Sequence, residues 1–266
     1  SLDDPVQKWV PGFVGEGKER VTVRHLLAHV GGLAAYERYH RSLRGKDAIV
    51  AAAAAEQLMG EPGAMVRYSD LGFMLLMSCV ESASGEAFDQ FVSRRLFEPL
   101  GLQSATFVPT SGAALQDAAP TEHDEQRGGV VRGYVHDENA FAMGGVSGHA
   151  GLFATAADVA RIGLFYLAGG RGIVPRELVD AARRPACDQP SRGLGLALPA
   201  AGGWAGSEPA IGTFGHTGFT GTSLWCDPRH DLCIVLLSNR VHPTRVNDRI
   251  QTVRRDVHDL VLASLR

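Results

Sequence analysis

A glycine-rich stretch at 212–221 holds the residues of this chain that are best placed to do chemistry, His216 followed by Thr217 and Gly218. A strand-like run at 222–226 follows it, which predicts that the stretch itself is a strand. Because side chains alternate along a strand, His216 and Gly218 should face the same side, where the missing side chain leaves room for a ligand. The pattern predicts either a binding ledge with a titratable group at its mouth or a tight corner between two core strands.

Two further groups have the residue types of metal ligands but not a convincing pattern. His25 and His29 are four residues apart, yet no third ligand is evident nearby, so packed or backbone-bonded histidines are favoured. A second group combines two histidines with two acids: His136, Asp137, Glu138 and His149. Acids in loops are usually solvated or cap helices, so we expect neither a metal nor another cofactor.

Ser147 invites comparison with the nucleophile elbow Gly-x-Ser-x-Gly. The comparison fails because His149 occupies the second glycine position and no convincing strand precedes the serine. Ser147 is therefore not predicted to be a nucleophile.

Composition excludes several classes of protein. The net charge is -3, and no basic run is interleaved with aromatic residues, which argues against a nucleic-acid-binding surface. No apolar run is long enough to span a bilayer, and the compartment is left open. The four cysteines lack C-x-x-C spacing. Cys226 and Cys233 flank a turn and could bond in an oxidising compartment, but two free thiols are the favoured state.

Helices dominate the first two thirds of the chain. Helical periodicity and capping residues predict them at 23–30, 46–58, 71–84, 87–97, 156–168 and from 175 onward, with a terminal helix at 245–265. Thr22, Ser69 or Asp70, and Thr155 are the expected N-caps. The stretch 103–132 is expected to be irregular.

Strands are expected late in the chain, as a short run at 194–198 and a hairpin of 211–226 with 232–238. Helices followed by strands indicate an α+β fold with two layers that meet near 212–221. We expect a mainly helical subdomain with active-site loops at 1–190 and the C-terminal strands and helix at 191–266.

Several of these motifs, taken in order, resemble the serine beta-lactamase-like family, which includes class C beta-lactamases, DD-peptidases and related esterases. They are Leu2-Asp3-Asp4-Pro5-Val6, Leu26-Leu27-Ala28-His29-Val30-Gly31-Gly32-Leu33, Tyr68-Ser69-Asp70 and His216-Thr217-Gly218. The resemblance covers nearly the whole chain. It implies an antiparallel sheet flanked by helices plus a helical subdomain, and acyl transfer through a covalent serine ester.

The resemblance also implies roles for individual residues. Tyr68 would shuttle a proton, with adjacent cations to lower its high pKa. Asp70 stands where many relatives have asparagine and could hydrogen-bond the catalytic lysine and a substrate amide. His216 replaces the lysine of the family's Lys-Thr-Gly strand, which implies weaker selection for a substrate carboxylate because a histidine is mostly neutral at pH 7.

The same strand would supply the remaining substrate contacts. Thr217 would donate a hydrogen bond to the substrate, Gly218 would lie along it, and the backbone N–H of Phe219 would form half of the oxyanion hole.

The sequence departs from the family at the nucleophile. The lysines are Lys8, Lys18 and Lys46, and none has a serine three residues before it, so the chain contains no Ser-x-x-Lys. In relatives that motif precedes the Leu-Asp-Asp-Pro segment. We therefore expect that the nucleophile helix and the N-terminal strands lie outside this chain and that the chain alone cannot acylate.

Two functions follow. The favoured one is a serine hydrolase that acts on a small-molecule or peptide ester, amide or peptide bond. The alternative is a non-catalytic relative that binds a ligand or partner along the ledge. A metallohydrolase is a distant third.

Overall fold

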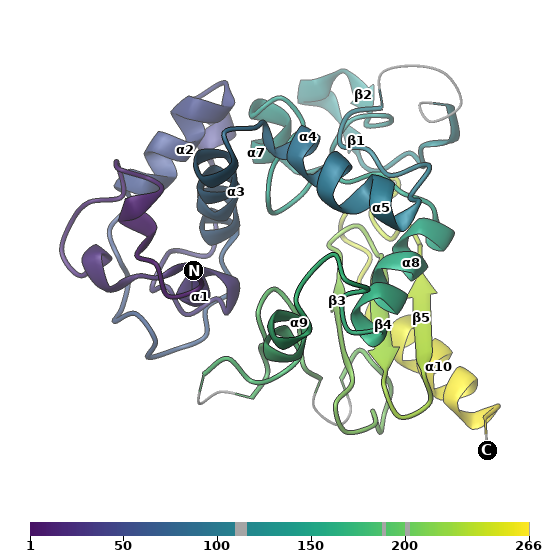
Figure 1. The fold of residues 1–266 in the computed structure, drawn as a ribbon. Helices are drawn as coiled ribbons and strands as arrows, with labels where there is room; N and C mark the ends of the chain where they lie inside the picture. Colours follow the sequence, from purple (N-terminus) through teal and green to yellow (C-terminus); the bar gives the residue numbers. More distant parts are fainter. Residues whose placement is uncertain (110–115, 188–189, 200–202, 266) are drawn as a thin grey trace.

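The computed structural model describes residues 1–109, 116–187, 190–199 and 203–265. Figure 1 shows two groups of elements, α1 to α3 on one side and the strands with α8 to α10 on the other. The helices are α1 (Val23–Leu27), α2 (Lys46–Ala55), α3 (Asp70–Ser84), α4 (Phe88–Val92), α5 (Glu98–Leu100), α7 (Glu138–Ala142), α8 (Ala156–Leu167), α9 (Arg176–Ala182) and α10 (Ile250–Ala263). Short 3-10 turns span Val6–Lys8, Lys18–Arg20, Tyr39–Arg41 and Glu125–Arg127.

The main sheet is antiparallel, in the order β3 (Phe214–Thr217), β4 (Ser223–Asp227), β5 (Leu232–Leu236). Its register pairs His216 with Leu224, and Cys226 with Cys233. A separate two-stranded ladder joins β1 (His123–Asp124) to β2 (Gly129–Val130). The expected hairpin around the Asp227-Pro228 turn is thus confirmed as β4 and β5.

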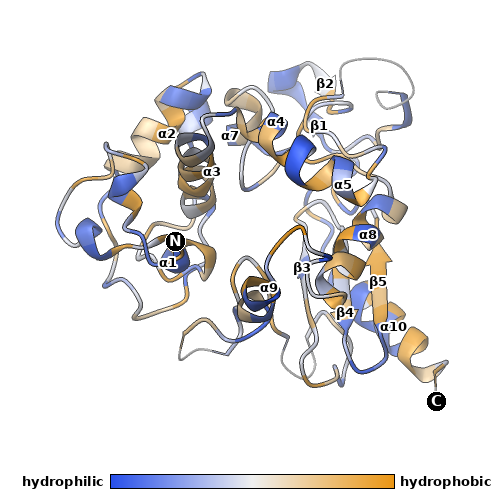
Figure 2. Ribbon diagram, in the orientation of Figure 1, coloured by the Kyte–Doolittle hydropathy of each residue, from blue (hydrophilic) through white to orange (hydrophobic). Residues whose placement is uncertain are grey.

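Three apolar clusters form the core, and the third packs Phe97, Leu100 and Leu102 against Phe165 of α8. The first packs α3, through Leu71, Met74 and Leu75, against the N-terminal turns and α2. The second joins residues after α1 to the sheet, through Ala28, Val30 and Phe214. The largely apolar colouring of β5 in Figure 2 agrees with the packing of α8 across β4 and β5. The division expected at residue 190 stays a prediction, although α8 precedes it and lies on the sheet.

The predicted N-caps are confirmed, because each side chain accepts a hydrogen bond from the first turn of its helix. Thr22 accepts from His25 N, Ser69 from Gly72 N, and Thr155 from Asp158 N. An orphan backbone N–H at each helix start is therefore satisfied as the sequence indicated.

Other boundaries differ from the predictions. The helix expected at 87–97 is divided, since Ser93–Phe97 forms a π-helical turn between α4 and α5. The terminal helix begins at Ile250, five residues later than predicted, and the Arg245 side chain before it pairs with Glu122 and Glu138. The run 194–198 forms no strand and contributes two isolated bridges, from Ala197 to Arg192 and from Ala197 to Gly215. Residues 110–115 of the predicted irregular stretch lie outside the described residues.

None of the helices in the described parts of the chain combines the length and apolarity needed to cross a bilayer. Cys226 and Cys233 face each other across β4 and β5 as thiols. The neighbouring Cys233 thiol, and after it burial, raises the pKa of Cys226.

Candidate active site

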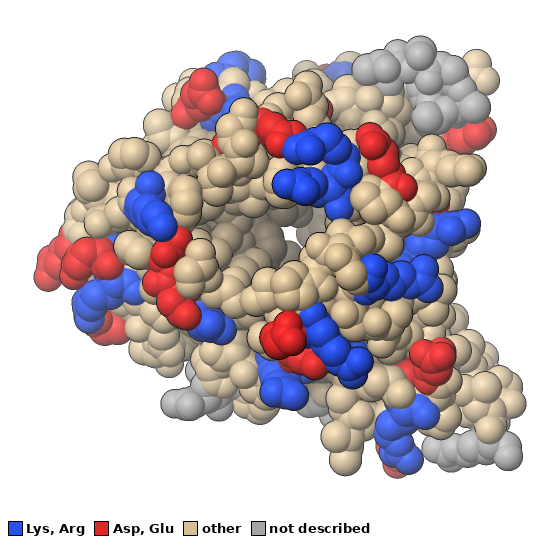
Figure 3. Space-filling model, in the orientation of Figure 1, with Lys and Arg blue, Asp and Glu red and all other residues tan. Residues whose placement is uncertain are grey.

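Tyr68 and His216 come together from distant parts of the chain. Ser69 is the N-cap of α3, and Tyr68 directly precedes it. The centre of the Tyr68 ring lies 4.4 Å from that of the His29 ring and 5.9 Å from that of the His216 ring. Figure 3 shows this face of the molecule hollowed between the side of α3 and the side of the sheet. The Tyr68 side of the predicted site is open to solvent, since 44% of Tyr68 is exposed.

Arg192 joins this pair. Its guanidinium carbon lies 5.3 Å from the centre of the Tyr68 ring, and its Nη1 lies 3.4 Å from His216 Nε2. The other ring nitrogen, Nδ1, is 2.9 Å from the carbonyl oxygen of Thr217. A ring that donates from Nδ1 to this carbonyl and accepts at Nε2 from the guanidinium satisfies both contacts as a neutral imidazole.

The electrostatics of the site agree with a neutral histidine. Burial lowers the pKa of His216, and the positive charge of Arg192 lowers it further. Burial raises the pKa of Tyr68, with Asp70 adding to the effect and Arg192 opposing it. Tyr68 is therefore a neutral phenol in this arrangement, and the one cation beside it only partly offsets burial.

The strand that carries His216 is bonded at Gly215 on the edge that faces away from β4. Ala197 N–H donates to the Gly215 oxygen at 2.8 Å, and Gly215 N–H donates to the Ala197 oxygen at 3.0 Å. In an antiparallel ladder such contacts alternate, so Thr217, two residues on, directs its backbone groups to the same outer edge. This is the edge on which the sequence predicted a ligand.

Gly218 has a different reason to be glycine from the one predicted. A Cβ at Gly218 would lie 2.2 Å from Thr222 Oγ1, so the missing side chain makes room for Thr222 and not for a ligand. The Gly218 N–H also donates to the Thr222 oxygen, at 2.7 Å. The sequence pattern shows that space is needed at Gly218 but not what fills it, and a ligand along this edge stays a prediction.

Phe219 is 58% exposed and follows this turn. Its carbonyl oxygen accepts from Arg240 Nε at 2.8 Å, and its ring stacks on His136 at 5.7 Å. These contacts hold the backbone at Phe219 in place, as a backbone N–H with an oxyanion role would require.

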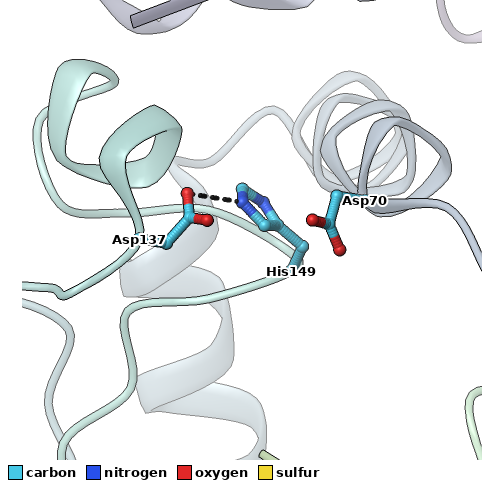
Figure 4. Close-up of side chains that lie close together, drawn as sticks. All are labelled: Asp70, Asp137 and His149. Carbon is cyan, nitrogen blue, oxygen red and sulfur yellow. Dashed lines mark hydrogen bonds and ion pairs between the residues drawn. The ribbon is translucent and has the colours of Figure 1, made fainter. Parts of the chain in front are cut away.

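Asp70, the first residue of α3, lies near two residues from other segments. The ligand atoms of Asp70, Asp137 and His149 all lie within 4.8 Å of one another. Figure 4 shows His149 between the two carboxylates, bonded to Asp137. Burial raises the pKa of Asp70 to about 6; His149 lowers it and the charge of Asp137 adds to the rise.

The other histidines and acids that the sequence analysis grouped as possible metal ligands have partners elsewhere. His25 Nδ1 accepts from Thr22 N–H, and His29 Nδ1 accepts from Ser69 N–H at 3.1 Å, so the prediction of backbone-bonded histidines is confirmed. His136 bonds Glu122 at 3.1 Å, and Glu138 pairs with Arg245. Only Asp137 and His149 of the four grouped residues converge, and Asp70 was not predicted to join them.

Ser147 lies at the far side of His149. Its hydroxyl is 2.7 Å from His149 Nδ1, and the residue is 2% exposed. Such burial suits a role in orienting the imidazole ring and not contact with a substrate.

Arg192 is the site residue that sequence reasoning missed. It lies in a stretch rich in glycine, where no periodicity places its side chain. The available signal was the need of Tyr68 for a cation, which the lysines of this chain do not supply. An apolar cavity of about 190 Å³ lies elsewhere, lined by Phe107, Val108, Tyr134, Val135, Phe141, Gly144 and Gly145. None of the predicted site residues lines it.

Comparison with known proteins gives consistent matches. The family model described as Beta-lactamase matches residues 1–259. A protein of Escherichia coli (strain K12) assigned as a D-alanyl-D-alanine carboxypeptidase is 35% identical over 276 residues, covering 90% of this chain and 63% of that protein. One from Salmonella typhi with the same assignment is 32% identical, covering 94% of this chain and 65% of its own length. The chain thus spans less than two thirds of the length of these relatives.

Solved structures share the fold. The octameric penicillin-binding protein homologue from Pyrococcus abyssi superposes with a TM-score of 0.72 at 21% identity, over 100% of this chain and 60% of that one. EstCE1, a hydrolase with promiscuous acyltransferase activity, gives 0.69 at 22% identity, over 97% of this chain and 76% of that one. The expected beta-lactamase-like α+β fold is confirmed. With a family model matched over residues 1–259 and relatives above 30% identity, this chain belongs to the beta-lactamase family.

Proposed function

We propose that this chain forms the tyrosine and His-Thr-Gly sides of a serine acyl-transfer site, in a hydrolase that acts on a peptide with a free carboxyl terminus. The observation that carries the proposal is the convergence of Tyr68, His216 and Arg192, with 5.9 Å between the first two rings and 3.4 Å between Arg192 Nη1 and His216 Nε2. Each residue alone has a structural explanation, but a phenol, a neutral imidazole and a guanidinium at one strand edge form a site.

Arg192 supports the choice of substrate. The neutral His216 by itself predicted weak selection for a carboxylate, whereas a guanidinium beside it supplies a permanent positive charge. An arginine can hold a carboxylate through two parallel hydrogen bonds. The assignment of the relatives as D-alanyl-D-alanine carboxypeptidases points to the same class of substrate, a peptide ending in D-alanine.

The roles of the other residues follow from their places. Tyr68 passes a proton between the nucleophile and the leaving group, and Thr217 and the Phe219 N–H bind the acyl group along the outer edge of β3. Asp70 binds the lysine partner of the nucleophile or a substrate amide. The nucleophile itself must come from a Ser-x-x-Lys, which the sequence of residues 1–266 does not contain.

A covalent probe tests the proposal. A fluorophosphonate or a fluorescent penicillin should label a longer form of the protein in which a Ser-x-x-Lys precedes Ser1, and should leave residues 1–266 unlabelled. Tyr68→Phe in the labelled protein should slow labelling by about 10²- to 10⁴-fold, since a positioned proton shuttle contributes that much. Tyr134→Phe is the matched control, because Tyr134 lines the separate apolar cavity.

The absence of Ser-x-x-Lys from the sequence also favours a second candidate, a ligand-binding relative without catalysis. Residues 1–266 would then bind a peptide ending in D-alanine, and the encoded protein would bind it without turnover or labelling. Labelling of residues 1–266 themselves contradicts both candidates, because both place no nucleophile within these residues.

A further inference from the structure

The turn between β3 and β4 leaves one backbone donor unused, the N–H of Phe219. Within the described residues, this N–H donates to no protein group. Its neighbours in the turn are paired, since the Gly218 N–H donates to the Thr222 oxygen at 2.7 Å and the Gly221 N–H to the Gly218 oxygen at 3.1 Å. An unpaired N–H of this kind is available to water or to a ligand.

The direction of the Phe219 N–H is set by the Gly218 oxygen, because both belong to one peptide group. A trans peptide is planar, and its C=O and N–H point in opposite directions. The Gly218 oxygen accepts from Arg254 Nη2 at 2.7 Å as well as from the Gly221 N–H. The oxygen is therefore held toward α10, which carries Arg254, and the Phe219 N–H is directed away from that helix.

Arg254 reaches this turn from the interior of the protein. The residue is 5% exposed, and its Nη2 also donates to the Thr222 oxygen, at 2.6 Å. Among the described residues no carboxylate pairs with the guanidinium, and its Nε is buried without a hydrogen-bond partner. Burial lowers the pKa of Arg254, and the charge of Arg240 lowers it further. An arginine stays charged even so, and burying this charge without a counter-ion costs stability.

The position of this charge strengthens the free donor. A hydrogen bond to a peptide carbonyl polarises the peptide group and makes its N–H a better donor. A guanidinium on the Gly218 oxygen does this more strongly than a neutral donor, because charge-assisted hydrogen bonds are the stronger kind. Fixed N–H donors are the groups that stabilise the oxyanion of an acyl-transfer reaction.

We propose that Arg254 is a positioning residue of the oxyanion hole, which directs and polarises the Phe219 N–H through the Gly218 carbonyl. The inference rests on the proposed function, because it takes this N–H as a donor to the oxyanion. Arg254 itself does not contact the substrate, since it lies buried on the carbonyl side of the peptide. It raises the reaction rate and not the affinity for the substrate, because the charge on the oxyanion develops only after binding.

Hydrogen exchange of residues 1–266 tests the polarisation without any nucleophile. Hydroxide removes the proton of an unbonded N–H, so the exchange rate measured by NMR rises when a nearby positive charge stabilises the peptide anion. Arg254→Met should therefore slow exchange of the Phe219 N–H by about tenfold or more, since a charge this close has at least that effect. If Arg254 only held the turn together, its loss would leave this exchange unchanged or faster.

Two further variants accompany this measurement. Arg255→Met removes the same charge from the next position of α10, where the side chain is 43% exposed and lies beside Asp256. This control should leave the exchange of the Phe219 N–H unchanged. Arg254→Gln removes the charge but retains an N–H₂ donor, and it should slow the exchange as Arg254→Met does. It decides the question if circular dichroism shows that Arg254→Met is unfolded.

The contribution to catalysis is read separately, in a longer form of the protein that the covalent probe labels. Arg254→Met should lower the maximal rate of labelling by about tenfold, less than the cost of about 10²- to 10³-fold for losing an oxyanion donor outright. The probe concentration that gives half of this rate should not change.

Exchange of the Phe219 N–H that does not slow overturns the role of Arg254, and so does labelling of Arg254→Met at the wild-type rate. A longer wild type that the probe does not label overturns the proposed function instead. In that case the exchange measurement still decides whether Arg254 polarises the Phe219 N–H.

Discussion

At the scale of single residues, His29 shows how burial controls a proton. The residue is 6% exposed, its ring stacks on Phe73 at 4.8 Å, and Nδ1 accepts the Ser69 N–H. Burial, with the charges of Arg192 and His216, lowers the pKa of His29 to about 3. The folded protein therefore requires the neutral ring that holds the start of α3.

This predicts that acid destabilises the fold through His29. Between the ordinary pKa of 6.5 and about 3, the unfolded chain binds one more proton than the folded one. The free energy of unfolding should thus fall as pH drops below 6.5, by up to ~1.4 kcal/mol per pH unit from this residue. Urea unfolding of wild type and His29→Asn at about pH 7 and about pH 5.5 checks it, since asparagine accepts the same hydrogen bond without titrating. Equal pH slopes for the two proteins would contradict the prediction.

A second prediction at this scale concerns Arg192. Arg192→Gln should weaken binding of an N-acyl-D-Ala-D-Ala peptide to residues 1–266 by about tenfold or more, because hydrogen bonds to a charged group contribute roughly 1.5–3 kcal/mol. Arg192→Gln should leave the affinity for the same peptide with a terminal carboxamide unchanged, because this peptide has no terminal charge for Arg192 to bind. Calorimetric titration gives both affinities.

Arg183→Gln is the control for this measurement, since Arg183 packs on Phe214 and pairs with Asp180, away from Tyr68. Equal losses of affinity for the acid and the amide would show that Arg192 does not bind the carboxylate.

The sequence was sufficient for part of the site. Tyr68 and His216 could be paired because each lies in a short motif whose order along the chain is informative. Arg192 could not be found, because its position depends on where Ala197 docks on β3. Asp70 could not be joined to His149 either, since two loops have to fold over α3 to bring them together.

At the scale of elements, α8 approaches the sheet through a glycine. A Cβ at Gly163 would lie 2.4 Å from Cys233 Sγ and 2.9 Å from Cys226 Sγ. The helix can lie this close to β4 and β5 only because Gly163 has no side chain.

Gly163→Ala should therefore destabilise the protein by about 1–3 kcal/mol, the usual cost of overpacking a core. Gly12→Ala is the control, because a Cβ there meets nothing within 4 Å. Adding Cys233→Ser, which replaces sulfur by a smaller atom on a shorter bond and so widens the gap, should recover part of the loss. The two changes should therefore not be additive in denaturant unfolding. A Gly163→Ala protein as stable as the control would contradict this packing.

Helix starts were predictable because capping is local, as Thr22, Ser69 and Thr155 show. The π-helical turn at Ser93–Phe97 was not, since amphipathic spacing does not distinguish it from an α-helix. The pairing of Ala197 with Gly215 could not be predicted either, because an isolated bridge leaves no periodic pattern in the sequence.

At the scale of the whole molecule, the loop that carries His149 docks directly on α3. A Cβ at Gly148 would lie 2.2 Å from the carbonyl oxygen of Phe73, so backbone meets backbone there. This contact joins the α3 side of the molecule to the segment that leads into α8.

Gly148→Ala should lower the free energy of unfolding by at least ~1 kcal/mol, because neither backbone can move aside cheaply. Hydrogen exchange should show faster opening of the 147–151 loop than in wild type, with β4 and β5 unaffected. Gly60→Ala, where a Cβ meets nothing within 4 Å, is the control. Unchanged protection of the loop would show that the contact is dispensable.

The segment that follows Arg192 bonds through its main chain to two distant parts of the molecule. Gly195 N–H donates to the Leu27 oxygen at 2.9 Å on one side, and Ala197 holds Gly215 on the other. Because these bonds lie within three residues of one another, the end of α1 and β3 cannot move apart without breaking one of them. A change in the length of this segment should therefore alter the spacing between the end of α1 and β3, and with it the range of substrates.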